Sequence, residues 1–229
     1  MNSLTPEVKI ILTELRELGD PKFLPDMERF GINTKSAFGI RIPHLRKLAK
    51  TVEKNHNLAL ELWKSGFHEA RILASMIGDP NLLTKSEMNN WVKDFNSWDL
   101  CDQCCNNLFV YSRHAYDKAF EWHARKKEFT KRAGFVLMAV MAVHKKEFAD
   151  TIFEEFLPLI KKEATDERNF VKKAVNWALR QIGKRNIRLN KLAIKTAKDI
   201  YKIDSKSAKW IASNALSELT NENIRIRMK

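Results

Sequence analysis

The stretch Lys131-Arg132-Ala133-Gly134-Phe135-Val136 decides how this chain folds, because close variants of it recur along the sequence. Each variant places basic residues before or within the first turn of an apolar, alanine-rich segment. Apolar residues three or four positions apart share one face of a helix, so each phrase predicts a helix that buries one side. The related phrases are Glu69-Ala70-Arg71-Ile72-Leu73-Ala74, Lys172-Lys173-Ala174-Val175-Asn176-Trp177 and Ala208-Lys209-Trp210-Ile211-Ala212.

The spacing between these phrases predicts a repeat built from pairs of helices. Arg132 precedes Lys173 by 41 residues, and Lys173 precedes Lys209 by 36 residues. Periods of this length suit two-helix repeats of the HEAT type, which stack into a curved solenoid. We therefore expect one all-α domain over residues 1–229, with the recurring basic residues lining a concave face. A generic helical bundle is the alternative.

Helical periodicity extends over the rest of the chain, and no segment alternates for long enough to predict a strand. Thr5 is expected to cap a first helix that begins at Pro6, with Val8, Ile11, Leu12 and Leu15 on its apolar face. The other helices are expected at 22–30, from Pro43 through Val52, and at 57–65, 68–77, 85–94, 97–109, 114–126, 128–143, 147–163, 167–183, 187–203 and 205–219.

The balance of charge points to a polyanionic partner. The chain has 41 Lys and Arg residues against 28 Asp and Glu, which gives a net charge of +13. Nucleic acid is the first candidate for such a partner, and a role in solubility alone is the alternative. The hydrophobic fraction of 44% is ordinary for a soluble globular protein.

The cysteines and the N-terminus predict a cytoplasmic protein. Cys101, Cys104 and Cys105 form an odd, clustered set that makes a poor disulfide framework, so we expect small packed side chains on one helix. The six histidines show no metal-ligand spacing, and neither a metal nor a cofactor is expected. No signal peptide or membrane-spanning apolar run is found.

The segment Ser97-Trp98-Asp99-Leu100-Cys101-Asp102 carries the most informative chemistry. On a helix, Trp98 and Asp102 lie four residues apart and share a face. An indole beside a carboxylate suits a cationic ligand, because both the ring face and the acid attract positive charge. Asp99, in the first turn, is expected mainly to complement the helix dipole. An acidic, aromatic point in a basic protein thus indicates a polyanion that carries one local positive charge.

Two further clusters suit a sugar–phosphate backbone. The guanidinium of Arg132, at the start of an apolar helix, can hold a phosphate in a bidentate manner. Lys173, Trp177 and Arg180 share one helical face, where the cations suit phosphates and the flat ring suits a sugar or base. A core position is the alternative for any single tryptophan. The tryptophans expected in the core are Trp63, Trp91, Trp122 and Trp210.

With these motifs the chain resembles the AlkD-like DNA alkylation repair glycosylases over essentially its whole length. An N-terminal signature, a Trp-Asp-x-x-Asp element, an arginine that opens a helix and a second tryptophan with its arginine occur in the family's order. The matching segments are Met27-Glu28-Arg29-Phe30, Phe38-Gly39-Ile40-Arg41-Ile42-Pro43-His44-Leu45-Arg46, Ser97-Trp98-Asp99-Leu100-Cys101-Asp102, Arg132-Ala133 and Asn176-Trp177-Ala178-Leu179-Arg180.

The resemblance implies a HEAT-like solenoid whose concave basic face holds duplex DNA with alkylated bases, and we expect the protein to be a monomer. It implies excision of positively charged N3- and N7-alkylated purines, with Asp102 as the catalytic carboxylate and Trp98 and Trp177 at the sugar and backbone of the lesion. The expected DNA contacts are Arg132, Lys173, Arg180, Arg46 and Phe30. The best-known members carry tyrosine at the position of Phe30, so the ring remains here without its hydroxyl. A helical scaffold that binds DNA or another polyanion without catalysis is the alternative function.

Overall fold

A computed structural model describes residues 4–226 of the chain. The described residues are predominantly helical and contain no strand, which confirms the predicted all-α class. They divide into two compact units, with the boundary between His114 and Ala115. Each unit has its own helices and its own candidate residues.

Unit 1, the part before Ala115, stacks α3, α5 and α7 side by side, with α4 packed against α5. Trp63 of α4 and Trp91 of α6 stack with ring centroids 4.0 Å apart and planes 5° apart, so α4 and α6 lie together as well. The helices of unit 1 are α1 (Pro6–Leu18), α2 (Leu24–Arg29), α3 (Ile42–Val52), α4 (His56–Lys64), α5 (His68–Ile77), α6 (Lys85–Lys93) and α7 (Trp98–Asn107), with 3-10 turns at Pro21–Phe23 and Phe109–Tyr111.

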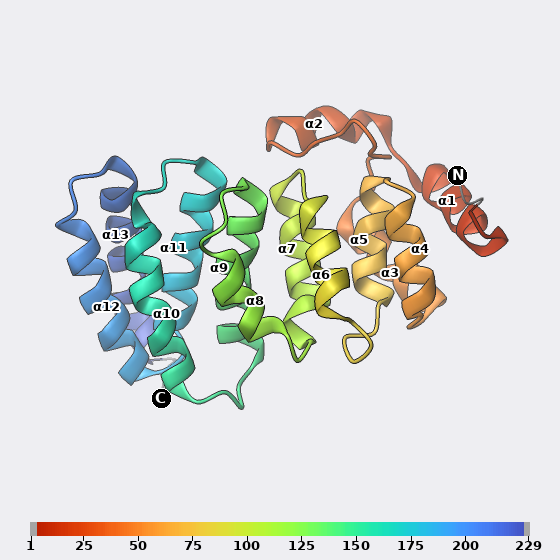
Figure 1. Ribbon diagram of the computed structural model, residues 1–229. Helices are drawn as coiled ribbons and strands as arrows, with labels where there is room; N and C mark the ends of the chain where they lie inside the picture. Colours follow the sequence, from red (N-terminus) through yellow and green to blue (C-terminus); the bar gives the residue numbers. More distant parts are fainter. Residues whose placement is uncertain (1–3, 227–229) are drawn as a thin grey trace. The chain divides into compact units, whose positions relative to one another are not determined.

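The beginning of unit 1 differs from its prediction in one place. The helix α1 begins at Pro6 and buries all four of its predicted apolar residues. The helix predicted at 22–30 instead breaks into the 3-10 turn at Pro21–Phe23 and the short helix α2. Pro25 cannot donate a backbone hydrogen bond to the turn before it, so the α-helix can begin only around this residue. Figure 1 shows α2 lying across one end of the helices of unit 1.

Unit 2 forms two layers of helices. In the first layer α11 packs between α9 and α13, and in the second layer α10 packs against α12; Figure 1 shows α10 and α12 in front of α11 and α13. The helices of unit 2 are α8 (Ala115–Trp122), α9 (Glu128–His144), α10 (Asp150–Lys162), α11 (Asn169–Gly183), α12 (Ile187–Tyr201), α13 (Lys206–Leu219) and α14 (Glu222–Ile226), with a 3-10 turn at Glu163–Thr165. The recurring phrases of unit 2 thus fall on the three adjacent helices of one layer.

Close packing explains why α9 is buried on almost all sides. A Cβ atom at Gly134 would lie 2.5 Å from the backbone nitrogen of His123, so only glycine lets α9 approach the end of α8 this closely. The three cysteines on α7 are also buried, which confirms the prediction that they pack within the fold.

Three contacts join α11 to α13, each one turn beyond the last along both helices, and we call them the α11–α13 ladder. All three pairs are 38 residues apart in sequence, so the two helices lie in register. The pairs are Lys172 Nζ with the Trp210 ring centroid at 5.2 Å, Asn176 Nδ2 with Asn214 Oδ1 at 2.7 Å, and Arg180 with Glu218 Oε2 at 2.5 Å.

Candidate functional site

The first turn of α7 holds Trp98 in a fixed orientation. Ser97 precedes the helix in an extended conformation, and Trp98 is the first helical residue. The indole Nε1 of Trp98 donates a hydrogen bond to the backbone carbonyl of Phe30 at 2.9 Å. This bond attaches the end of α2 to the start of α7, so the structure brings the predicted residues Phe30 and Trp98 together. Asp102 lies one turn further along α7 and is half-buried.

A buried His68–Asp99 pair lies at the same end of α7. Nε2 of His68 is 2.8 Å from Oδ2 of Asp99, and the hydroxyl of Ser97 donates to Oδ1 of Asp99 at 2.6 Å. Burial raises the pKa of Asp99, but the hydrogen bond and charge of His68, together with hydrogen bonds from Ser97 and the Leu100 amide, leave the pKa lowered overall. Burial likewise lowers the pKa of His68, and the hydrogen bond and charge of Asp99 raise it overall. The pair therefore favours the charged form of both groups and fixes α7 to α5.

The sequence alone does not predict this pair, because Asp99 is assigned mainly to the helix dipole and His68 is considered only as one of six histidines without metal-ligand spacing. The two residues are 31 positions apart, and their meeting depends on how α5 packs against α7. The available signal was the position of each residue at the start of its helix in consecutive repeats.

The buried carboxylate of Glu69 holds the loop that follows α2. It accepts three backbone hydrogen bonds, from the amides of Phe38 at 2.8 Å, Gly39 at 2.8 Å and Ile40 at 3.1 Å. Gly39 has φ of +84°, and a Cβ atom there would lie 2.3 Å from the carbonyl oxygen of Asp20. The Phe-Gly-Ile segment of the N-terminal signature is therefore the part of the loop that docks onto α5. We call these three bonds the Glu69 clasp.

The other candidate residues of unit 1 are at the surface. The ring of Phe30 is exposed, with the guanidinium carbon of Arg29 5.2 Å from its centroid. Arg46 lies on α3, exposed, and forms no ion pair with any described residue. Both are therefore open to a ligand on unit 1.

In unit 2 the position of Arg132 differs from the expected surface site. The side chain lies in the first turns of α9 and is only 5% exposed. One terminal nitrogen donates to the backbone carbonyl of Phe170 at 2.6 Å, which links α9 to the start of α11. The polar contact that the sequence assigned to a phosphate is thus made here to the protein backbone. A phosphate contact by Arg132 stays a prediction.

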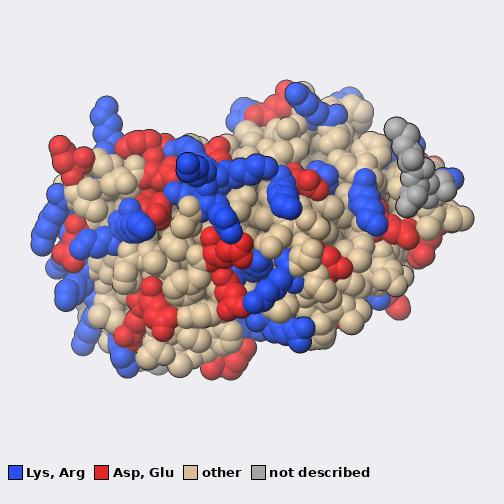
Figure 2. Space-filling model, in the orientation of Figure 1, with Lys and Arg blue, Asp and Glu red and all other residues tan. Residues whose placement is uncertain are grey.

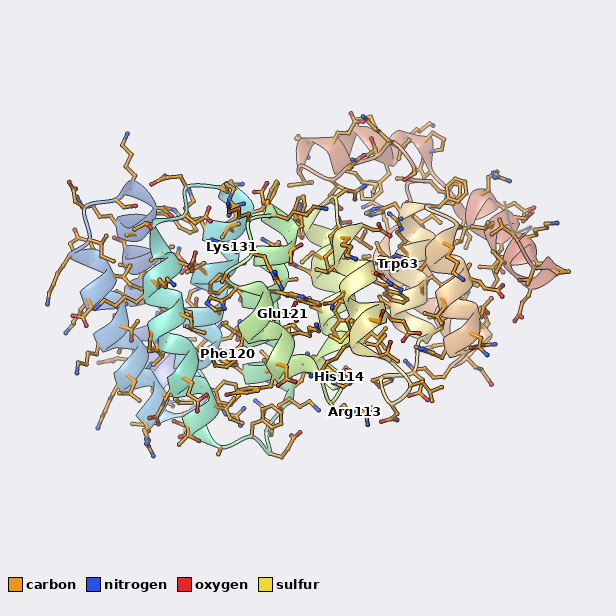
Figure 3. All side chains as sticks on the ribbon, viewed as in Figure 1. Trp63, Arg113, His114, Phe120, Glu121 and Lys131 are labelled. Carbon is orange, nitrogen blue, oxygen red and sulfur yellow. The ribbon has the colours of Figure 1, made fainter. Side chains whose placement is uncertain are left out.

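Lys131, which Figure 3 labels on α9, is engaged in a similar way. Its ammonium pairs with Glu163 at 2.5 Å and with Asp166 at 3.3 Å. These carboxylates offset its positive charge, so Lys131 is a weaker candidate for a phosphate contact than an unpaired lysine.

On α11 the predicted residues form one row along a face of the helix: Trp177 lies four residues after Lys173, and Arg180 lies three residues after Trp177. Lys173 is exposed and forms no ion pair within residues 4–226, while Trp177 is half-buried. With the Gln181 amide turned so that its oxygen faces the indole, Trp177 Nε1 lies 3.0 Å from that oxygen. The row therefore combines a free ammonium with an indole held at its nitrogen.

Arg180 completes the row and belongs to the α11–α13 ladder. It shares the carboxylate of Glu218 with Lys184, whose Nζ lies 2.6 Å from Oε1. Burial raises the pKa of Glu218, but the hydrogen bond from Lys184 and the charge of Arg180 lower it overall, so Glu218 remains ionised. Arg180 is thus already paired with the Glu218 carboxylate before any phosphate binds.

Trp210 corrects the prediction of four core tryptophans. Trp63, Trp91 and Trp122 are buried as expected, but Trp210 on α13 is 40% exposed. The apolar phrase around it predicted burial, but Trp210 lies beside the buried stripe of α13, on the side of the helix that also carries the exposed Lys206. Its ring therefore stays partly open to solvent.

The surface over the second layer of unit 2 has a mixed charge. Figure 2 shows Lys and Arg interspersed with Asp and Glu over α10 and α12. None of the candidate residues of unit 2 lies on these two helices.

Among residues 4–226 there is no cluster of three or more His, Cys, Asp or Glu side chains that suits a metal, and no helix has the length and apolarity to cross a bilayer.

The buried pair gives unit 1 a pH-dependent stability that can be measured. Since the pKa of His68 is raised from 6.5, the pair's contribution is complete below that value and is lost as pH rises through the raised pKa. Since the pKa of Asp99 is lowered from 3.8, the contribution of Asp99 to folding stability is complete above pH 3.8 and is lost as pH falls through the lowered pKa. We expect His68→Gln to lower the unfolding free energy more at about pH 5 than at about pH 9 in urea denaturation. His44→Gln, at an exposed position, should show no such trend, and a loss for His68→Gln that is equal at both pH values would contradict the pairing.

Comparison with known proteins places this geometry in context. The model of a family described as "DNA alkylation repair enzyme" matches residues 11–219. A solved structure described as "a new family of proteins related to the HEAT-like repeat DNA glycosylases with affinity for branched DNA structures" is similar, with a TM-score of 0.75 and 23% identity over 93% of this chain and 95% of that chain. At this identity the likeness shows a shared fold. A comparison with curated proteins finds no match.

Proposed function

This chain belongs to the DNA alkylation repair enzyme family, and from that premise we propose that it binds duplex DNA and excises positively charged N3- and N7-alkylated purines. The family predicted from the sequence motifs is confirmed. The observation that carries the proposed chemistry is the half-buried carboxylate of Asp102, one turn beyond an indole anchored on the Phe30 carbonyl.

The chemistry of the substrate explains why one carboxylate suffices. When the bond between the sugar C1′ and the base nitrogen breaks, its electron pair neutralises the cationic purine, which leaves without needing a proton. The sugar becomes an oxocarbenium-like cation, and a water oxygen then adds to C1′ and gives up a proton. A carboxylate near C1′ stabilises the positive charge and can position or deprotonate that water.

Unit 1 supplies this chemistry in our proposal. Asp102 stabilises the developing charge, and the face of Trp98 attracts the cationic sugar through its quadrupole. The bond from Trp98 to the Phe30 carbonyl fixes the indole before DNA arrives, so little of its rotamer freedom is lost on binding. The rings of Trp98 and Phe30 then serve as apolar contacts beside the sugar.

Unit 2 supplies backbone contacts in our proposal. Lys173 offers an unpaired ammonium to a phosphate, Arg180 adds a second cation, and Trp177 lies between them on the same row of α11. Such contacts fix the position of the DNA and carry no sequence information.

The function is tested by incubating the protein with a duplex that contains 7-methylguanine and measuring released base against time. Release above the spontaneous rate supports excision. Tight binding without release would overturn excision and leave the second candidate, which is recognition of DNA structure without catalysis. Two observations favour that candidate: the similar solved structure is described by its affinity for branched DNA, and Phe30 lacks a hydroxyl.

The phosphate contact of Lys173 predicts a change in salt dependence. Each lost phosphate contact lowers the slope of log affinity against log salt by about one unit, because fewer counterions are released. We therefore expect Lys173→Ala to weaken duplex binding and to reduce this slope by about one unit in fluorescence anisotropy. Lys195→Ala removes the same charge from the exposed face of α12 and should leave the slope unchanged. Equal slopes for the parent and Lys173→Ala would remove Lys173 from the interface.

A further inference from the structure

The exposed indole of Trp210 has no role in the proposed excision, yet a contact with the neighbouring helix holds it in place. It stands at one end of the α11–α13 ladder, with the ammonium of Lys172 5.2 Å from its ring centroid. Burying an indole removes a large apolar area from water, so an indole left 40% exposed forgoes much of that gain. The exposure is therefore an observation that a ligand would explain.

The side chains around Trp210 favour a negatively charged ligand. Lys206, one turn before Trp210 on α13, is exposed and forms no ion pair with a described residue. Lys172 contributes a second positive charge at the ring, and the exposed Ser213, one turn beyond, offers a hydroxyl. Cations, a hydroxyl and a flat ring are the groups that bind a phosphate and stack on a base.

Nearby acids do not cancel this charge. Glu218 is shared by Arg180 and Lys184, and Asp204 is paired with Lys209 at 3.0 Å. Glu167 accepts hydrogen bonds from Ser205 and from the backbone of Ser207 at the start of α13. Glu218 and Asp204 thus already have cationic partners, Glu167 is held by neutral donors, and Lys206 forms no ion pair with any of these three carboxylates.

We propose that Trp210, with Lys172 and Lys206, is a stacking platform for an unpaired nucleotide of DNA. In a duplex the faces of the bases are covered by their neighbours, so a side chain on a helix surface can stack only on a base that is unpaired or terminal. Duplex contacts of unit 2 go through phosphates, whereas the platform takes a single-stranded segment next to the duplex. This inference rests on the proposed DNA binding of unit 2 and is independent of excision.

The test compares two fluorescein-labelled probes, a blunt duplex and the same duplex with a short unpaired thymidine tail. We expect the parent protein to bind the tailed probe more tightly. Trp210→Ala should bind the tailed probe about fivefold or more weakly than the parent, since stacking on one base accounts for at least that factor. The blunt duplex offers only its terminal base pairs to the ring, so its affinity should fall less. Trp210→Phe keeps a ring and should retain part of the preference for the tail.

Tyr201→Ala is the matched control, because it removes an exposed aromatic ring from α12 in the second layer and should change neither affinity. Circular dichroism melting of each variant separates lost binding from lost folding. The platform is overturned if the parent binds both probes equally or if Trp210→Ala keeps the full preference for the tail. Base release from methylated duplex, measured on the same preparations, tests excision separately, so a protein that releases nothing but prefers the tailed probe retains the platform.

Discussion

Replacing Asp102 by asparagine should leave DNA affinity almost unchanged and lower the rate of 7-methylguanine release by about a hundredfold. Asparagine keeps the shape of the side chain but removes the charge that stabilises the oxocarbenium-like sugar, and the loss of one such electrostatic contact lowers rates by about two to three orders of magnitude. Single-turnover kinetics with enzyme in excess measures the chemical step, and anisotropy measures binding on the same duplex.

The control for this change is Glu14→Gln, which removes one negative charge from an exposed position on α1 and should affect neither quantity. If Asp102→Asn releases the base as fast as the parent, the carboxylate has a structural role. If affinity and rate fall together, the substitution has disturbed α7 itself, which a lowered melting temperature would reveal.

Loss of the Glu69 clasp should have the largest effect on stability. Glu69→Ala leaves three backbone amides without their acceptor, of which those of Gly39 and Ile40 are buried and that of Phe38 is part-buried. Each unsatisfied buried donor costs about 1–3 kcal/mol, so we expect the unfolding free energy to fall by about 3 kcal/mol or more. Chemical denaturation followed by tryptophan fluorescence measures this loss.

The same substitution should loosen the chain before α3. The clasp holds the loop that leads from Phe30 to α3, so its loss should make this loop the first site cut in limited proteolysis. Glu61→Ala is the matched control, because Glu61 accepts a hydrogen bond from the exposed Thr5 hydroxyl and from no backbone amide among residues 4–226, and its loss should cost less than about 1 kcal/mol. Comparable losses for the two variants would contradict the importance assigned to the clasp.

The helices were predictable because their signals are local. The apolar spacing in α1 and the proline at its first turn place the helix where the structure has it, and the phrase at 68–77 matches α5 residue for residue. The predicted ends of helices were wrong where a local turn competes with continuation of the helix. The helix expected at 114–126 ends at Trp122, as Arg125 turns back to bond the Trp122 carbonyl, and the short α14 carried no signal strong enough to be expected.

The partners of the polar residues were not predictable, because they depend on contacts between repeats. Arg132 at the start of an apolar helix is compatible both with a phosphate ligand and with a link to the next helix, and the link to the Phe170 carbonyl depends on a residue 38 positions away. Glu69 and Asp99 look like first-turn acids, yet one holds a loop and the other a buried histidine. The prediction for Trp210 was wrong because the phrase around it is apolar, whereas Trp210 itself lies on the exposed side of α13 beside Lys206.

The claim that this protein acts on cationic bases is tested most directly by the charge of the base. Matched duplexes would carry either 7-methylguanine or its neutral 7-deaza counterpart, which has the same shape, and the released base would be quantified under single-turnover conditions. We expect release of 7-methylguanine above its spontaneous rate and no release of the neutral base, since Asp102 stabilises the sugar cation but provides no proton for a neutral leaving group. Release of the two bases at similar rates, or no release of 7-methylguanine at all, would contradict the proposed function.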